Sequence, residues 1–133
     1  MKKVIWGVLS TARIGRERVL PGMKKSSLIE IRAIASRDGA RARNAADALG
    51  IPRAYGSYEA LLADPEIEAI YNPLPNHLHV PLTLQAAAAG KHVLCEKPIT
   101  LPYGVEDAIA NMRVIDALFR SERTGQWEAI AHD

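Results

Sequence analysis

Four stretches of this sequence carry residue types that bind anions or move protons. The first is a run of small residues, which follows an apolar segment and precedes a predicted helix: Ser10-Thr11-Ala12-Arg13-Ile14-Gly15. Free amides at a helix N-terminus, and small side chains that let an anion approach the backbone, suit a phosphate group. The G-x-G-x-x-G fingerprint of dinucleotide-binding turns has three glycines, whereas only Gly15 is present here. A small-residue turn without a ligand is therefore an equally good interpretation.

The second stretch, Ser36-Arg37-Asp38, ends another apolar segment. Ser36 lies 21 residues after Gly15, where an NAD-specific site places a carboxylate against the ribose. A hydroxyl and a guanidinium suit a 2′-phosphate instead, which a carboxylate would repel. We therefore expect NADP in preference to NAD, with NAD as the alternative. An arginine that faces solvent would give the same pattern, and Asp38 could compete for the ribose or neutralise Arg37.

The third stretch is Asn72-Pro73-Leu74-Pro75-Asn76-His77-Leu78-His79, in which two prolines fix a polar loop. Asn76 could serve only as a helix cap. His77 and His79 are two residues apart, a spacing that a helix splays, so we expect no metal site there and surface histidines are the alternative.

The fourth stretch is Cys95-Glu96-Lys97-Pro98. A lysine held by a following proline could bring its ammonium to a substrate oxygen. A surface charge at Lys97 and a small apolar residue at Cys95 are the alternatives.

Short apolar segments alternate with helical patterns through the first hundred residues, and the four stretches follow them. We predict strands over residues 4–9, 29–35, 54–55, 67–71 and 92–95, and helices over 13–25, 40–49, 58–63 and 78–89. Pro21 and Gly22 are expected to interrupt the first helix, Ser57 to cap the third, and Pro81 to fall within the first turn of the fourth. This alternation predicts an α/β fold with a doubly wound parallel sheet, a Rossmann fold, in which ligands bind beyond the carboxyl ends of the strands.

Composition and charge narrow the class of protein further. The chain has 133 residues, of which 48% are apolar and 24% charged, as in one globular domain. A net charge of +2 is too small to make nucleic acid the expected partner. We also expect no membrane span, no metal site and, with Cys95 as the single cysteine, a reducing cytoplasmic location.

Residues 105–123 have apolar positions at helical spacing, which predicts an added C-terminal helix that ends at Thr124-Gly125. A short apolar tail follows it.

The four stretches, together with Ala89-Gly90-Lys91-His92-Val93-Leu94, resemble the Gfo/Idh/MocA oxidoreductase family. The resemblance covers residues 1 to about 101 and implies an NADP-binding Rossmann domain. It implies a pyrophosphate site at Ser10, Ala12 and Gly15, and a 2′-phosphate site at Ser36 and Arg37. Asn76 and His79 would lie along the nicotinamide, and Lys97 would contact substrate and assist proton transfer as the catalytic residue. The other cofactor-binding positions that it implies are Thr11, Arg13, Ile14, Pro73, Leu74, Glu96 and, again, Lys97.

The same resemblance implies that a substrate domain is missing. Family members are roughly two and a half times as long as this chain, in keeping with a second domain of ordinary size. Residues 102–133 resemble the C-terminal helix of the family, which packs back on the Rossmann domain, so we expect a deletion joint near residues 101–102. The chain is then a dinucleotide-binding module with little or no turnover. A folded scaffold that has lost cofactor binding, and a minimal sugar or polyol dehydrogenase, are the alternatives.

Loss of that domain would also expose apolar surface. Val105, Leu118, Phe119 and Trp127 are the residues through which we expect a homodimer. Burial of all four against their own sheet, which would leave a monomer, is the alternative.

Overall fold

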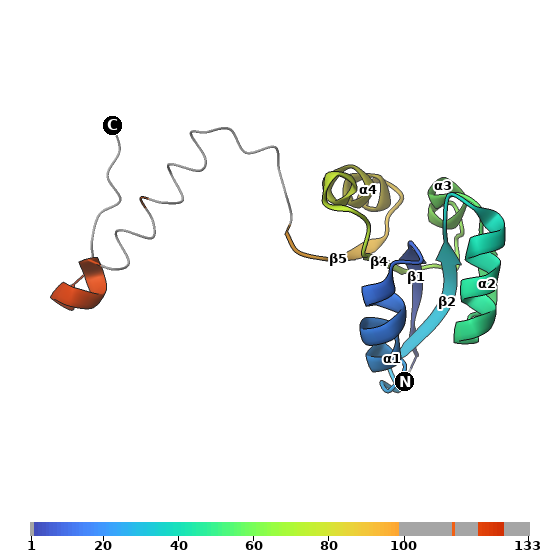
Figure 1. Cartoon of the computed structure of the whole chain (residues 1–133), viewed down its shortest axis with the longest axis horizontal. Coiled ribbons are helices and arrows are strands. Elements are labelled where there is room, and N and C mark those ends of the chain that lie inside the picture. The colour runs from blue at the N-terminus through green and yellow to red at the C-terminus, as the bar shows by residue number, and fades with distance from the viewer. Residues whose placement is uncertain (1, 99–112, 114–119, 127–133) are drawn as a thin grey trace. The chain divides into compact units, whose positions relative to one another are not determined.

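A computed structural model describes residues 2–98, 113 and 120–126 of the chain, which divides into two units at residues 100 and 101. The first unit holds five parallel strands: β1 (Val4–Leu9), β2 (Ile29–Ala35), β3 (Arg53–Tyr55), β4 (Ala69–Asn72) and β5 (His92–Cys95). The sheet order is β3-β2-β1-β4-β5, so the winding direction changes at β1 (Figure 1). This order confirms the predicted doubly wound α/β fold, and it opens a crevice beyond the carboxyl ends of β1 and β4.

Helices cover both faces of the sheet. The helical elements are η1 (Gly15–Val19), α1 (Leu20–Met23), α2 (Gly39–Leu49), α3 (Tyr58–Leu62) and α4 (Asn76–Ala88). Val8, Ile34 and Tyr71 face a core with residues of α1 and α2, whereas their strand neighbours face a second core with residues of α3 and α4. Successive strand residues point to opposite faces, so strands buried on both sides read as continuous apolar runs.

Gly7, in the middle of β1, lets α3 lie close against the sheet. A Cβ added at this position would stand 2.7 Å from Cδ2 of Leu61, 3.2 Å from Cγ2 of Ile67 and 3.3 Å from Cδ1 of Ile70. These three side chains are at most 2% exposed, so none can move into solvent to make room. The contact between α3 and the sheet therefore depends on a residue without a side chain.

The first helix differs from its prediction. Pro21 and Gly22 do not interrupt it, because helical backbone runs from residue 13 to 23. Its middle part, η1, is a π-helix, in which the amide of Leu20 donates to the carbonyl of Gly15. Pro21 is the second residue of α1 and lies just after this π-helical turn.

The fourth helix also begins elsewhere than predicted. Pro75 takes the cap position with φ −57°, so α4 starts at Asn76 and Pro81 lies inside it, beyond the first turn. The prediction that Pro81 falls within the first turn is therefore wrong, because the preceding proline starts the helix two residues early. The alternative that Asn76 serves only as a helix cap does not apply, since Pro75 takes the cap position.

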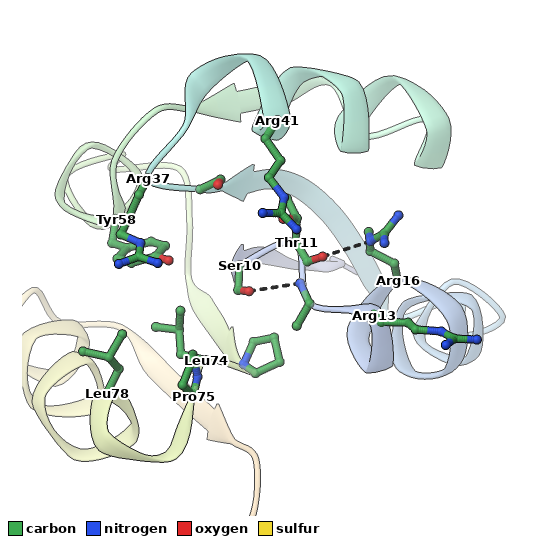
Figure 2. A pocket seen from close by; sticks show the side chains of 13 residues that line it. Ser10, Thr11, Arg13, Arg16, Arg37, Arg41, Tyr58, Leu74, Pro75 and Leu78 are labelled. Atoms are coloured by element: carbon green, nitrogen blue, oxygen red, sulfur yellow. Dashed lines mark hydrogen bonds between the residues drawn. The ribbon is translucent and has the colours of Figure 1, made fainter.

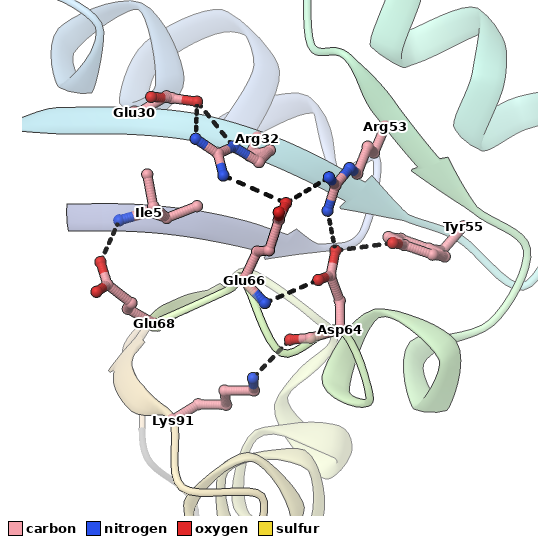
Figure 3. A network of polar contacts seen from close by, with 9 residues as sticks. All are labelled: Ile5, Glu30, Arg32, Arg53, Tyr55, Asp64, Glu66, Glu68 and Lys91. Carbon is pink, nitrogen blue, oxygen red and sulfur yellow. Dashed lines mark hydrogen bonds and ion pairs between the residues drawn. The ribbon is translucent and has the colours of Figure 1, made fainter. Parts of the chain in front are cut away.

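Asp64 organises a polar network at the turn between α3 and β4 (Figure 3). Its Oδ2 accepts hydrogen bonds from Nη1 of Arg53 and from the hydroxyl of Tyr55, both at 2.8 Å, and its Oδ1 accepts from the amide of Glu66 at 2.9 Å. Nζ of Lys91 donates to the Asp64 carbonyl at 2.7 Å. Burial opposes ionisation of this carboxyl, but the hydrogen bonds outweigh it and hold the pKa of Asp64 below its usual value.

In the second unit, the structure describes residue 113 and residues 120–126. Residues 120–124 are helical, and Gly125 follows with φ +68° and donates from its amide to the Ser121 carbonyl at 2.8 Å. This confirms the predicted helix end, because a left-handed glycine is the commonest helix terminator. Val105, Leu118, Phe119 and Trp127 lie outside the described residues. In the described part of the chain, no helix is long and apolar enough to cross a membrane.

Candidate functional site

A pocket of about 480 Å³ lies at the carboxyl ends of β1, β2 and β4 (Figure 2). Eight of the predicted cofactor-binding residues line it: Ser10, Thr11, Ala12, Arg13, Ser36, Arg37, Pro73 and Leu74. They come from three loops that are far apart in the sequence, and the parallel sheet brings these loops to one edge. The volume is in the range of small-molecule and cofactor pockets.

Ser10 has an unusual backbone in this pocket. Its φ is +117°, and it is the one non-glycine residue with a positive φ in the described part of the chain. It occupies the first glycine position of the dinucleotide fingerprint, where the tight turn requires such a value. Its Oγ accepts a hydrogen bond from the amide of Ala12 at 3.0 Å. The turn therefore has the shape that glycine normally supplies, held by a serine under strain.

This strain can be measured by comparing two variants. Ser10→Ala and Ser10→Gly both lose the hydroxyl, but only alanine keeps a Cβ in the strained conformation. We expect Ser10→Gly to be more stable than Ser10→Ala by about 1 kcal/mol, although alanine is usually the more stable of the two in regular structure. Urea denaturation followed by circular dichroism would measure the difference. Equal stabilities would show that the backbone at Ser10 is unstrained.

The two arginines of the first turn are engaged locally. Nε of Arg16 donates to the Thr11 carbonyl at 2.9 Å, whereas Nε of Arg13 donates to the Glu17 carboxylate at 2.9 Å on an exposed surface. Helical backbone begins at Arg13, and the amide of Arg16 is bonded to the Ala12 carbonyl. The amides before Arg16 thus belong to the first helical turn, which has no intrahelical acceptors for them and suits an anion.

The Ser36-Arg37-Asp38 loop leaves its guanidinium available. Asp38 caps α2, because its Oδ1 accepts from the amide of Arg41 at 3.0 Å, while Oγ of Ser36 accepts from the amide of Asp38 at 3.3 Å. Among the described residues, Asp38 therefore forms no ion pair with Arg37, and it does not line the pocket of about 480 Å³. Within the described residues, the side chains of Arg37 and Arg41 form no hydrogen bond or ion pair, and both line the pocket.

The sequence analysis missed five lining residues: Arg16, Arg41, Tyr58, Pro75 and Leu78. Arg41 had a usable signal, because it lies four residues after Arg37 across the start of α2. Tyr58, the first residue of α3, had no such signal in the sequence, since only the packing of the β3–α3 loop brings it to this pocket. Gly39 and Gly56 explain that packing: a Cβ at Gly56 would lie 3.4 Å from Cα of Gly39, so the β2–α2 and β3–α3 loops touch through bare backbone.

A smaller pocket of about 240 Å³ shares Pro73 and Leu74 with the first. The remaining residues that line it are Ile14, Asn76, His79, Glu96 and Lys97, all of them predicted cofactor-binding positions. Gly15 lines neither pocket; it lies buried behind them, where a Cβ would stand 3.4 Å from Cε1 of Tyr71. The fold thus brings fourteen predicted positions to one edge of the sheet, in two adjoining pockets and the turn behind them.

His79 is not a surface histidine, because it is 1% exposed. Its Nδ1 lies 2.8 Å from the carbonyl oxygen of Pro98, and this carbonyl can only accept, so Nδ1 carries the proton. Its Nε2 is buried and has no partner within the described residues. A buried ring nitrogen left to accept a hydrogen bond in a pocket wall is suited to a donor on a ligand.

Glu96 and Lys97 follow β5 directly. The hydroxyl of Tyr71 donates to Oε1 of Glu96 at 2.7 Å, and the Glu96 amide donates to the Asn72 carbonyl at 3.0 Å. Burial, and then the Glu96 carboxylate, raise the pKa of the Tyr71 hydroxyl, so it stays a proton donor. Lys97 itself is exposed.

A doubly wound sheet with this crevice, a first helical turn with free amides, and two arginines beside it that have no side-chain partner among the described residues are typical of a dinucleotide-binding Rossmann domain. The family model for the oxidoreductase family with an NAD-binding Rossmann fold matches residues 4–118. The chain therefore belongs to the Gfo/Idh/MocA oxidoreductase family.

Known relatives agree with this assignment. An uncharacterized oxidoreductase, ORF334 of Rhizobium meliloti, is 52% identical over 126 residues, which cover 95% of this chain and 35% of that protein. D-xylose 1-dehydrogenase (NADP(+)) 2 of Haloferax volcanii is 57% identical over 97 residues, or 73% of this chain and 30% of that protein. The chain spans about a third of the length of the curated relatives it matches.

Among solved structures, the 3-ketoreductase KijD10 of Actinomadura kijaniata, in complex with TDP-benzene and NADP, is similar. The two share 39% sequence identity with a TM-score of 0.71, over 74% of this chain and 31% of that protein.

Proposed function

We propose that this chain is the NADP-binding part of a dehydrogenase or reductase that acts on a sugar or polyol. The observation that carries the proposal concerns the residues just after β2. Ser36, Arg37 and Arg41 line the pocket of about 480 Å³, whereas the carboxylate of Asp38 caps α2. Two guanidinium groups without a partner among the described residues favour a phosphate dianion, and the described residues that line this pocket include no carboxylate to repel it.

The residues that line the two pockets supply a group for each part of such a ligand. The first turn, with Ser10, Thr11 and Ala12, would hold the pyrophosphate, and Arg37 and Arg41 would hold the 2′-phosphate. Tyr58 and Leu78 would flank the adenosine half. In the smaller pocket, the buried Nε2 of His79 would accept a hydrogen bond from the nicotinamide half, beside Asn76 and Glu96. The bound dinucleotide would supply hydride transfer, and Lys97 would bring its ammonium to the substrate.

Cofactor preference tests the proposal. We expect NADPH to bind more tightly than NADH, and Arg37→Ala to remove most of that difference, a loss of about tenfold or more for a charge-assisted contact to phosphate. Isothermal titration calorimetry of both cofactors would measure it.

Arg43→Ala is the matched control, because Arg43 lies on α2, six residues after Arg37, but pairs with Asp47 at 2.7 Å on an exposed surface. It should leave the preference unchanged. Equal affinities of the unaltered chain for NADPH and NADH would refute NADP specificity. Binding of neither would favour the scaffold without cofactor.

Three further parts of the hypothesis remain predictions. Low turnover is one of them; the structure shows that Lys97 is exposed and lines the smaller pocket. The expected joint near residues 101–102 lies outside the described residues, and the family match at 4–118 extends to both sides of it. The homodimer rests on residues that are also outside the described part.

A further inference from the structure

Tyr71 touches both halves of the candidate site, although no motif of the sequence points to it. It is the third residue of β4, 1% exposed, and lies in the core on the side of α1 and α2. One edge of its ring packs beneath Gly15, where a Cβ would stand 3.4 Å from Cε1. Its hydroxyl, on the neighbouring ring carbon, donates to Oε1 of Glu96 at 2.7 Å.

The loop that carries Lys97 is held on both sides of this lysine. Before it, Glu96 is fixed through its side chain by Tyr71 and through its amide by the Asn72 carbonyl. After it, the Pro98 carbonyl is bonded to Nδ1 of His79 at 2.8 Å. One of these three contacts comes from the backbone of β4 and one from the buried His79 of α4, and the Tyr71 hydroxyl supplies the third.

We propose that Tyr71 is a positioning residue for Lys97, and that its ring links the pyrophosphate turn at Gly15 to the loop after β5. The inference rests on the proposed function, because it assumes that a dinucleotide extends from the first turn to Lys97. A rigid aromatic ring that contacts one loop through Cε1 and the other through its hydroxyl keeps these two loops at a constant separation, which a shared ligand requires. Glu96 takes part in this positioning because its carboxylate accepts the hydrogen bond that the Tyr71 hydroxyl donates.

Tyr71→Phe removes only the hydroxyl, so it tests this role with little change in packing. The readout is the protection of Lys97 from acetylation by acetic anhydride, measured by mass spectrometry with and without saturating NADPH and normalised to Lys3. In the unaltered chain, NADPH should protect Lys97. In Tyr71→Phe this protection should fall by about threefold, while the affinity for 2′,5′-ADP, which lacks the nicotinamide, stays the same.

Tyr55→Phe is the matched control. Tyr55 also donates its hydroxyl to a carboxylate, at 2.8 Å to Oδ2 of Asp64, but it does so away from both pockets. A general loss of stability would affect both variants alike, whereas loss of positioning would affect only Tyr71→Phe. Glu96→Ala breaks the same hydrogen bond from its other end. The double variant should therefore lose no more protection of Lys97 than the more strongly affected of the two single variants.

The possible failures can be told apart. If 2′,5′-ADP does not bind the unaltered chain, the proposed function is wrong, and the inference falls with it. If 2′,5′-ADP binds but Tyr71→Phe and Glu96→Ala protect Lys97 as well as the unaltered chain does, only the positioning role is wrong. The same conclusion follows if NADPH gives no protection of Lys97 at all. Reduced protection in Tyr55→Phe as well would show that the effect is one of stability.

Discussion

Gly7→Val should lower the free energy of unfolding by about 3 kcal/mol, the upper part of the usual range for overpacking a core. The first atom of the new side chain would already stand 2.7 Å from Cδ2 of Leu61, closer than carbon atoms pack. Leu61, Ile67 and Ile70 are buried, so α3 would have to move off the sheet. Urea denaturation followed by circular dichroism would measure the change.

Gly22→Ala is the control for this substitution. Gly22 is an exposed glycine of α1 with no atom within 4 Å of an added Cβ, so alanine should stabilise the helix by about 0.5–1 kcal/mol. A Gly7→Val chain as stable as the unaltered one would mean that α3 is not packed on β1 in solution.

Asp64→Ala should cost about 3 kcal/mol, because it leaves the Tyr55 hydroxyl, the Glu66 amide and the Arg53 guanidinium without their common acceptor. Asp47→Ala offers a matched comparison: Asp47 also pairs with an arginine, but both groups are exposed, so its removal should cost about 0.5 kcal/mol. Equal losses in the two variants would contradict a structural role for the Asp64 network.

The same carboxyl makes stability depend on pH. The pKa of Asp64 is lower in the folded chain than in the unfolded one, where it is about 3.9. Its contribution is therefore fully present above the unfolded value and is lost as pH falls through the folded value. Between about pH 5 and pH 2 the unaltered chain should lose stability more steeply than Asp64→Ala. Parallel curves for the two chains would show that Asp64 is ionised equally in both states.

Much of this fold could be predicted because its signals are local. The runs at 4–9, 29–35 and 92–95 match β1, β2 and β5. For β1 and β2 the reason is that helices cover both faces of the middle of the sheet, whereas β5 is an edge strand that leaves His92 and Leu94 exposed. Element ends were less certain. β4 begins at Ala69, two residues later than predicted, because Ile67 packs in the core before the strand pairing starts.

The candidate site was predictable where the chemistry follows directly on a strand. Ser10, Ser36 and Lys97 lie within two residues of a strand end, so the topology alone places them at one edge. Tyr58 and Tyr71 could not be found in this way. Tyr58 reaches the pocket through a loop contact, and Tyr71 is an ordinary buried strand residue in the sequence, whose hydroxyl partner is 25 positions away.

The backbone contact between Gly39 and Gly56 limits how cofactor preference could be redesigned. At this point the loop before Tyr58 touches the start of α2, just after Ser36, Arg37 and Asp38, so a change of loop length here would break a backbone contact. An attempt to convert the domain to NAD should therefore exchange side chains at Ser36, Arg37 and Arg41 and keep the loop lengths as they are. Grafting a longer β2–α2 loop from an NAD-dependent relative would displace Tyr58 along with the arginines.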